Sequence, residues 1–379
     1  MTTATGAIAR LRIGAYRFPF REPWPSPLGP QRVREGLLLA LEDDEGRVGI
    51  GESAPFPGFG METLASSRSA LRIAARYAVG LPAEHFLGAA EDLPRLAPVV
   101  ASPGARAALD VALHDLAAQR AGLPLARLLR AGAADHVRAN AALPRLPADG
   151  AARAAAEAVG HGARCVKLKV GGAPLAQDLE RVRAVRQAIG PEIALRVDAN
   201  QAWSEGEAID ALRAFAPYEL DYAEQPVAAG AVEAMARVRS ALAGVVRIAA
   251  DESLADGRAA RRLLSLKAAD VFVVKPMALG GLAAAHAVIA LARDAGVEVT
   301  VTSLVESAVG RAAALHLAAS LADGRDHGVA TGSALAEDLL PGFADQPGSI
   351  GISTESGLGA ALRAAAMART EPVLLGDGA

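Results

Sequence analysis

Short apolar runs rich in β-branched residues alternate with longer Ala-rich segments along most of the chain. In the longer segments the apolar residues recur at helical spacing, whereas the short runs have the length of buried strands. The predicted strands cover residues 137–143, 163–170, 193–199, 220–224, 245–250, 270–274, 297–302 and 328–331. The predicted helices cover residues 149–160, 175–189, 205–216, 230–243, 256–266, 281–295 and 306–322. Eight strands separated by seven helices predict an α/β fold, a (β/α)7β barrel similar to a TIM barrel. An open parallel sheet is the weaker alternative, because no Gly-rich phosphate loop follows the first strand.

The first 130 residues have a different pattern. Strand-like runs at 8–18, 35–41 and 47–52 precede two helical segments, 64–79 and 105–121, which together predict an α+β module in front of the barrel. Between them, residues 52–60 form a Pro/Gly-rich loop that carries Phe56 and Phe59. This loop is either a plain turn or a lid over a pocket.

Composition narrows the class of protein. The 379 residues are 52% hydrophobic and 21% charged, with a formal net charge of −3, which is typical of a globular protein with a large core. No segment concentrates basic residues together with aromatic ones, and no apolar run reaches the 18 or so residues that span a bilayer, so we expect neither nucleic acid nor a membrane as partner. The chain start lacks a secretory signal, and a single cysteine, Cys165, is consistent with a reducing compartment. We therefore expect a cytoplasmic protein that acts on small molecules.

Lysine usage gives the first chemical indication. Of the 39 basic residues only four are lysines, and two of these, Lys167 and Lys169, stand two positions apart in one apolar run. On a strand this spacing places both side chains on the same side. Arginine keeps its proton in proteins, whereas a desolvated lysine can release it, so lysines retained in an Arg-rich sequence indicate base chemistry.

Ionisable residues also follow the predicted strand ends. Five successive strands carry one or more of them at or just beyond the carboxyl end: Lys167 and Lys169, Asp198 (with Asn200 beyond it), Glu224, Asp251 and Lys275. Barrel enzymes carry their catalytic residues at this end of the strands. The sequence therefore predicts an active site at the mouth of the barrel.

Three of these side chains are carboxylates on adjacent strands, and they would repel one another without a cation between them. Oxygen ligands without thiolate or imidazole favour Mg²⁺. The competing interpretation is a set of ion pairs with lysines or with Arg196. A divalent cation flanked by lysines suits removal of the weakly acidic α-proton of a carboxylate, because the cation stabilises the enediolate that forms.

The combination of these motifs resembles the enolase superfamily, specifically its muconate-lactonizing subgroup. The matching segments are Lys167-Leu168-Lys169, Asp198-Ala199-Asn200, Glu224-Gln225-Pro226, Asp251-Glu252-Ser253 and Lys275-Pro276. The resemblance implies a capping domain at 1–130, a barrel at 131–345 and a segment at 346–379 that returns to the cap. It also implies that Asp198, Glu224 and Asp251 hold Mg²⁺, that Lys169 is the base, that Lys275 acts from the other face and that Lys167 supports Lys169.

Other segments resemble the o-succinylbenzoate synthase family within that subgroup. They are residues 51–59, 140–143, 302–310 and 327–339. The likeness implies a lyase of menaquinone biosynthesis, which dehydrates 2-succinyl-6-hydroxy-2,4-cyclohexadiene-1-carboxylate. Thr302 and Ala308 depart from the family pattern, which leaves the binding of the succinyl group open. The residues expected to contact the small-molecule carboxylate are Asn200, Arg196, Ser303, Glu306, Ser307, Phe56 and Phe59.

Rival functions remain open at this point. An N-succinylamino acid racemase needs the same two lysines, and a muconate cycloisomerase fits the same motifs. Dipeptide epimerases of the superfamily usually carry an Asp-x-Asp on the eighth strand to hold the substrate ammonium, and residues 329–333 contain no acid. A Schiff-base lyase would use a lysine as nucleophile without a metal and would leave the three acids without a role. A homo-oligomer is compatible with the sequence.

Three further residues carry expectations of their own. Arg196 is expected either in a structural ion pair or against the substrate. Glu252 is expected to point away from the site, and Cys165 to be a core thiol.

Overall fold

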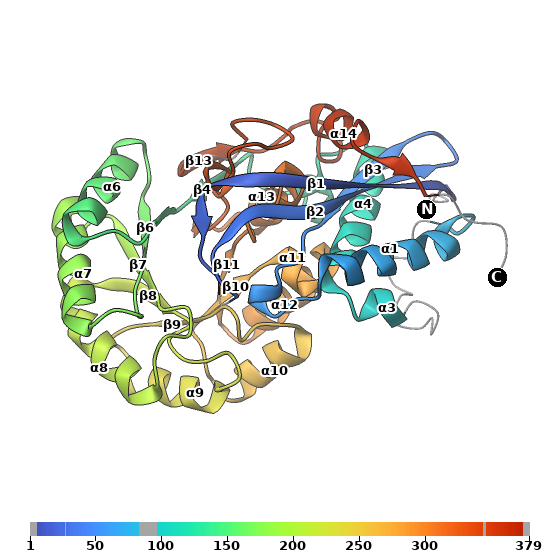
Figure 1. Cartoon of the computed structure of the whole chain (residues 1–379). Helices are drawn as coiled ribbons and strands as arrows, with labels where there is room; N and C mark the ends of the chain where they lie inside the picture. The colour runs from blue at the N-terminus through green and yellow to red at the C-terminus, as the bar shows by residue number, and fades with distance from the viewer. Residues whose placement is uncertain (1–5, 27, 83–96, 344–345, 374–379) are drawn as a thin grey trace.

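Seven parallel strands form one curved sheet in which the spatial order follows the sequence (Figure 1). The computed structural model describes residues 6–26, 28–82, 97–343 and 346–373. The strands are β5 (Ala141–Leu143), β6 (Cys165–Lys169), β7 (Ala194–Asp198), β8 (Leu220–Glu224), β9 (Ile248–Ala250), β10 (Val271–Val274) and β11 (Glu298–Val301). Their side chains are buried with few exceptions, as expected for parallel strands covered by helices on the outside.

The two edges of this sheet are joined by a small second sheet. Strand β4 (His136–Ala139) directly precedes β5 and pairs with β12 (Asp326–His327), while Thr302, just after β11, bridges Gly328, just after β12. The strands therefore occupy eight positions of a closed ring, with β4 and β5 sharing the first position. The (β/α)7β barrel predicted from the sequence is confirmed.

The eighth strand is displaced from its predicted position. Residues 328–331 were expected to form it, but the strand is Asp326–His327, and the chain turns into a short 3₁₀ helix, η4 (Gly332–Ala334). Val329 is fully buried all the same. The apolar pattern thus predicted the burial of Val329, but burial does not require strand pairing.

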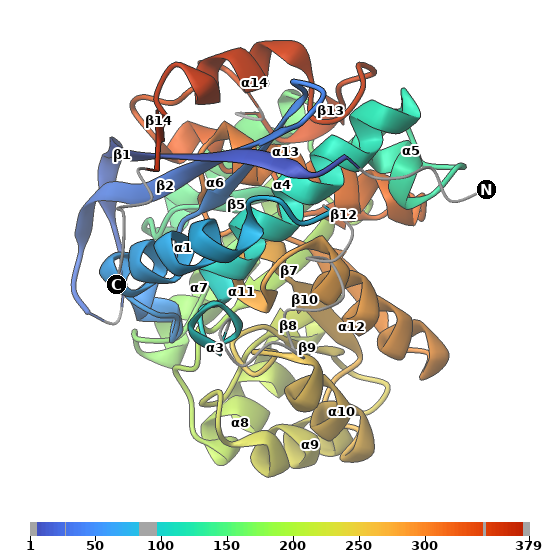
Figure 2. The same cartoon turned by 90° about the vertical axis from the view of Figure 1, so that its right-hand side faces the viewer.

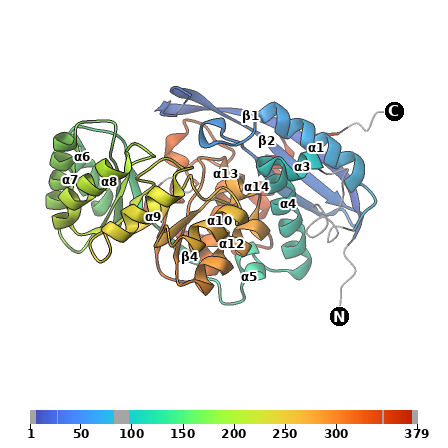
Figure 3. The ribbon, with the colours of Figure 1, turned by 90° about the horizontal axis from the view of Figure 1, so that it is seen from below.

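Helices cover the outside of the barrel and follow the strands in turn (Figure 3). They are α6 (Ala148–Gly160), α7 (Leu175–Ile189), α8 (Glu205–Phe215), α9 (Val232–Ala241), α10 (Gly257–Ser265), α12 (Leu282–Asp294) and α13 (Ala308–Leu321), each within three residues of prediction at both ends. Two short helices, α5 (Leu125–Leu129) and α11 (Pro276–Leu279), were not predicted. Helix α8 begins with a capping box, in which Ser204 and Glu207 satisfy each other's backbone N–H groups. No helix in the described ranges is both long and apolar enough to cross a membrane.

The N-terminal module is an antiparallel sheet with helices packed on it (Figure 2). Its strands are β1 (Ile8–Trp24), β2 (Gln31–Asp43) and β3 (Val48–Ser53), and its helices are α1 (Leu64–Ala78), the short α3 (Ala97–Val100) and α4 (Pro103–Ala121), with a 3₁₀ turn, η1 (Pro57–Phe59), in the loop after β3. Helix α4 lies very close to β3, because a Cβ on Gly51 would collide with the carbonyl of Ala108. Glycine there permits a contact that any other residue would prevent.

The C-terminal segment touches both parts of the molecule. Strand β13 (Gly348–Gly351) pairs with β4 of the barrel, whereas β14 (Glu371–Pro372) pairs with β1 of the cap. Between them, α14 (Ala360–Met367) packs against β2, β3 and α13. Residues 1–5, 27, 83–96, 344–345 and 374–379, which the expected domain limits include, lie outside the described residues.

Candidate active site

Three acidic residues stand side by side at the carboxyl ends of adjacent strands. Asp198 ends β7 and Glu224 ends β8, and the two are register partners. Asp251 directly follows β9, the next strand in the ring. All three are buried, at 1–3% exposure. The barrel therefore gathers three carboxylates that lie 26 and 27 positions apart in the sequence.

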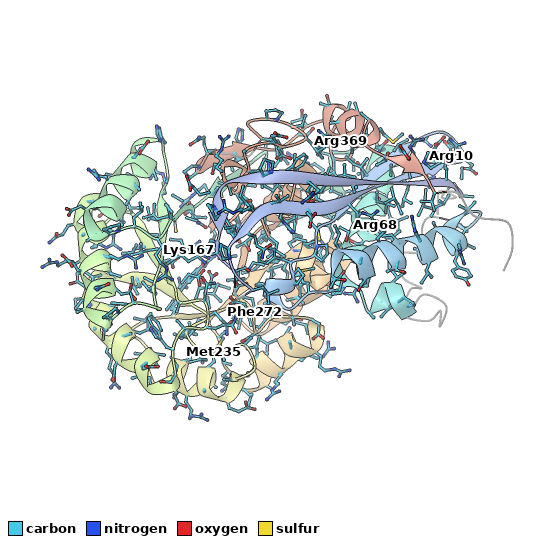
Figure 4. The ribbon with its side chains drawn as sticks, in the orientation of Figure 1. Arg10, Arg68, Lys167, Met235, Phe272 and Arg369 are labelled. Atoms are coloured by element: carbon cyan, nitrogen blue, oxygen red, sulfur yellow. The ribbon has the colours of Figure 1, made fainter. Side chains whose placement is uncertain are left out.

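Two lysines on β6, Lys167 and Lys169, lie next to these acids. Figure 4 labels Lys167. Lys167 Nζ donates to Glu224 Oε1 at 2.6 Å and lies 3.1 Å from Asp198 Oδ2. Lys169 Nζ, one pleat nearer the mouth, lies 2.7 Å from Asp198 Oδ2 and 2.5 Å from Asn200 Oδ1. The ammonium groups are thus held at defined points beside the acids.

A third lysine faces them from the other side of the ring. Lys275 follows β10 and forms an ion pair with Asp251. Counting β4 and β5 as the first of eight positions, β6 is the second and β10 the sixth. Positions four apart in a ring of eight are opposite each other. Lys169 and Lys275 therefore project from opposite walls, with the three acidic strand ends between them.

Burial and neighbouring charges shift the pKa values of the three carboxylates in different directions. Burial and the neighbouring Asp198 raise the pKa of Glu224 to about 7. Burial also raises the pKa of Asp251, whereas at Asp198 the attraction of Lys167 and Lys169 outweighs burial and lowers the pKa. At Lys167 burial is likewise outweighed, because Asp198 and Glu224 raise its pKa. Neighbouring cations therefore compensate the negative charge of Glu224 less well than that of Asp198.

The donor set fits a hard divalent cation. Among the described residues no three acidic, histidine or cysteine side chains already stand in metal-binding geometry, because these carboxylates turn toward the lysines. Glu224 Oε2, however, is buried without a hydrogen-bond partner, an unfavourable state for a carboxylate oxygen. An all-oxygen set with one free ligand atom suits Mg²⁺. A cation there would also relieve the repulsion at Glu224.

Two residues that support the site had not been assigned a role from the sequence. The Gln225 side chain accepts hydrogen bonds from the backbone of Asp251 and Ser253 at 3.0 and 3.1 Å, which fixes the turn that carries Asp251. Glu252 was expected to point away, and this was wrong. Its Oε1 accepts from Asn200 Nδ2 at 3.2 Å. Strand alternation does not apply to it, because β9 ends at Ala250.

The Pro/Gly-rich loop of the cap lies over the mouth of the barrel. The Phe59 ring centroid is 4.2 Å from Lys275 Nζ, and Phe59 packs with Phe56 and Met61 against Met277 and Leu304 of the barrel. Arg34, which no sequence signal marked, donates to carbonyls on both sides of this contact, among them Pro55 at 3.0 Å and Val305 at 3.1 Å. Residues 52–60 therefore have the position expected of a lid.

Residues 303–307 are divided between the mouth and the cap interface. Ser303 Oγ, two residues beyond β11, is 2.6 Å from Thr331 Oγ1, which directly precedes η4. Ser307 instead donates through its backbone N–H to Glu52 Oε1 of the cap at 2.9 Å. Glu306 is buried beside Glu52, and burial together with that charge raises its pKa to about 7.

Arg196 and Cys165 lie deeper in the barrel. Arg196 Nε is 2.8 Å from Asp221 Oδ2, its Nη1 donates to the Asp326 carbonyl at 2.8 Å, and its guanidinium lies over the Tyr222 ring. These contacts correspond to the structural ion pair, one of the two expectations for this residue. Cys165 is fully buried, and burial raises the pKa of its thiol to about 12, as for a core residue.

Family comparisons cover most of the chain. Residues 18–130 match the mandelate racemase/muconate lactonizing enzyme N-terminal domain, and residues 150–366 match the enolase C-terminal domain-like family. The chain is 32% identical over 314 residues to a hydrophobic dipeptide epimerase of Enterococcus faecalis, covering 83% of this chain and 87% of that one. It is 35% identical over 320 residues to an N-succinylamino acid racemase of Thermus thermophilus, at 82% and 81% coverage.

Two further similarities bear on the chemistry. An o-succinylbenzoate synthase of Thermobifida fusca is 41% identical over 189 residues, which is 49% of this chain and 56% of that one. The crystal structure of the dipeptide epimerase from Enterococcus faecalis complexed with Mg and the dipeptide L-Leu-L-Tyr superimposes with a TM-score of 0.86 at 30% identity, covering 93% of this chain and 99% of that one. Mg²⁺ is thus bound by a close structural neighbour, consistent with the donor set described above.

Proposed function

The chain belongs to the enolase superfamily, in its mandelate racemase/muconate lactonizing enzyme branch, and from that premise we propose that it moves a proton at the α-carbon of an N-acylated amino acid. N-succinyl amino acids are the proposed substrate class, and inversion at the α-carbon is the proposed outcome. The observation that carries this proposal is the position of Lys169 and Lys275 on opposite walls of the ring. Inversion needs a base on one face of the α-carbon and an acid on the other.

The lysines perform the proton transfer. In one direction Lys169 in its neutral form takes the α-proton, and Lys275 as ammonium delivers a proton to the opposite face; in the other direction the roles exchange. Lys167, held between Glu224 and Asp198, stays charged and helps to stabilise negative charge on the substrate carboxylate. Asn200, which contacts Lys169 and Glu252, holds the Lys169 amine in place.

Asp198, Glu224 and Asp251 are the residues that would hold Mg²⁺. When bound, Mg²⁺ supplies electrostatic stabilisation of the enediolate that the substrate forms. The cap loop contributes by covering the mouth, because Phe59 lies against Lys275 and so excludes water from that side.

Charged residues near the eighth strand bear on the nitrogen substituent that the substrate can carry. Residues 329–333, beyond the eighth strand, contain no acid, and the nearby Asp338 is bound by Arg311 and by the backbone of Ala308, so it is not free to hold a substrate ammonium. A neutral amide nitrogen with an acyl group fits such a surface better than a free amino terminus. Several relatives nevertheless act on dipeptides by name, so dipeptides belong in the test.

Dehydration to o-succinylbenzoate is the second candidate. It begins with the same abstraction of an α-proton by a lysine, and the 41% identity to an o-succinylbenzoate synthase over 189 residues favours it. This reaction needs a lysine on one face only, so it leaves Lys275 with an electrostatic role.

The test is an exchange and inversion assay of the full chain with Mg²⁺ in deuterated water. Each enantiomer of a panel of N-succinyl amino acids is followed by proton NMR and polarimetry, beside dipeptides with free amino termini and the cyclohexadiene carboxylate. We expect α-deuteration with inversion of the N-succinyl substrates. Turnover of dipeptides alone would overturn the acyl assignment, and dehydration alone would establish the second candidate.

A further inference from the structure

Three arginines form a row on the exposed face of helix α1 in the cap. Arg68, Arg72 and Arg76 follow one another at intervals of four residues, so their stems rise about 6 Å apart along the helix. All three are exposed, and no hydrogen bond or ion pair joins them to another residue in the described part of the chain. Helix α1 itself contains no Asp or Glu. Like charges at this spacing repel one another, which makes the row unfavourable for the helix unless an anion lies against it.

A hollow lies beside this row. It has a cavity volume of about 730 Å³ and is bounded by the three arginines, by Ile13, Ala15 and Leu37 of strands β1 and β2, and by residues of the segment 369–373. A second hollow of about 360 Å³ continues past Arg68 and Arg72 toward the start of α1. The larger volume is within the range of small-molecule sites. The charged row therefore borders a space with an apolar floor.

The far wall of the hollow is built by close backbone packing. The segment 369–373 runs along the edge of β1, where β14 pairs with Arg12 and Ile13. A Cβ on Gly14 would collide with the Arg369 carbonyl, so glycine at this position lets the wall approach. The Arg369 guanidinium lies 5.4 Å from the Phe18 ring centroid and is positioned by that contact. The hollow thus joins elements from both ends of the chain.

From this arrangement we propose that the cap carries a binding site for a small organic anion with two or more phosphate or carboxylate groups. Guanidinium groups bind phosphate and carboxylate through paired hydrogen bonds, and a row of three engages charges spread along a molecule. The apolar floor accommodates the uncharged part of such a ligand. Figure 4 shows Arg68 on the cap, well apart from Lys167 in the barrel, so this site is separate from the catalytic one.

One acidic residue, Glu371, also lines the hollow, and no ion pair joins it to the arginines. Its charge opposes an anion in the hollow. The site therefore offers substitutions in both directions: removing arginines weakens anion binding, whereas Glu371→Gln strengthens it.

Isothermal titration calorimetry of the full chain, at constant ionic strength, tests the proposal with pyrophosphate, citrate and ATP as probes and acetate as the monovalent control. We expect the multivalent probes to bind and acetate not to bind. The triple variant Arg68→Gln, Arg72→Gln, Arg76→Gln should bind about tenfold more weakly or worse, and Glu371→Gln about twofold more tightly. Binding should weaken as salt is raised.

The matched control is the triple variant Arg183→Gln, Arg258→Gln, Arg261→Gln on helices α7 and α10, three exposed arginines that border neither of these hollows. Circular dichroism and thermal unfolding report whether each variant is folded. Equal loss of binding in this control variant, which removes the same number of charges, would overturn the proposal because it would show a net-charge effect. So would the absence of binding by all multivalent probes, or binding that the triple variant leaves unchanged.

Discussion

The ammonium nitrogen of Lys275 lies 4.2 Å from the centroid of the Phe59 ring, so an aromatic residue of the cap covers a charged residue of the barrel. A cation over a ring face is stabilised by the ring quadrupole, more strongly where water is excluded. The cap therefore contacts one proposed catalytic group directly and helps to hold it in position.

Replacing Phe59 by leucine tests this contact, because leucine keeps the apolar bulk and removes the ring face. We expect kcat/KM to fall about threefold to tenfold. Phe59→Tyr retains the ring and should stay within about twofold of the parent. Equal activities of the leucine and tyrosine variants in the exchange assay would mean that the ring face contributes nothing.

With two lysines on opposite faces of the substrate, removing either one should abolish inversion but leave deuterium exchange of one enantiomer. In Lys169→Ala or Lys275→Ala, inversion should fall by about a thousandfold or more, because one of the two proton-transfer groups is gone. Deuterium exchange should persist for the one enantiomer whose α-proton faces the remaining lysine. Proton NMR of each enantiomer in deuterated water measures both effects.

Arginine provides the matched controls for that experiment. Lys169→Arg keeps the positive charge but cannot act as a base, so it should be as inactive as the alanine variant. Lys267→Arg changes an exposed lysine outside the site and should be fully active. Substantial inversion by Lys169→Arg would argue against proton abstraction at this position.

Removing the charge of Glu224 should abolish the thermal stabilisation that Mg²⁺ gives to the protein. The wild-type protein should gain thermal stability when Mg²⁺ is added and lose activity with EDTA, because a ligand that binds only the folded state stabilises it. In Glu224→Gln we expect little or no shift in Tm with Mg²⁺ and no detectable turnover. Glu157→Gln, an exposed glutamate on α6, is the control and should respond like the wild type.

The buried carboxyl group of Glu306 should make the free energy of unfolding depend on pH. Burial and Glu52 raise its pKa to about 7 in the folded protein, from 4.5 in the unfolded chain, so the folded state holds the proton more tightly. The contribution of Glu306 to stability is therefore fully present below pH 4.5 and is lost as the pH rises through about 7, an effect of about 3 kcal/mol.

Glu306→Gln should remove that loss, because the amide oxygen can still accept the hydrogen bond that Leu304 N donates. Urea unfolding at pH 5 and pH 8 measures the difference. Relative to the wild type, the variant should gain stability at pH 8 and not at pH 5. Glu337→Gln, at an exposed position, should follow the wild type at both values.

Local patterns in the sequence were sufficient to predict the barrel and the strand ends at which its acids and lysines lie. Apolar runs of strand length, separated by helical segments, specify a parallel α/β fold because each strand must be covered on both faces. The ends of these runs then located Lys169, Asp198, Glu224 and Lys275 at one edge, since parallel strands end on the same side.

Only the tertiary structure decided which residues meet across long distances in the chain. Arg34 gave no signal in the sequence, yet it is buried and joins the cap loop to the Leu304–Val305 carbonyls, because burial of a charge depends on neighbours that folding brings in. The same holds for Phe59 over Lys275 and for the hollow beside Arg72. Periodicity reports which face of an element is buried, whereas the partner that covers that face is set by packing between elements far apart in sequence.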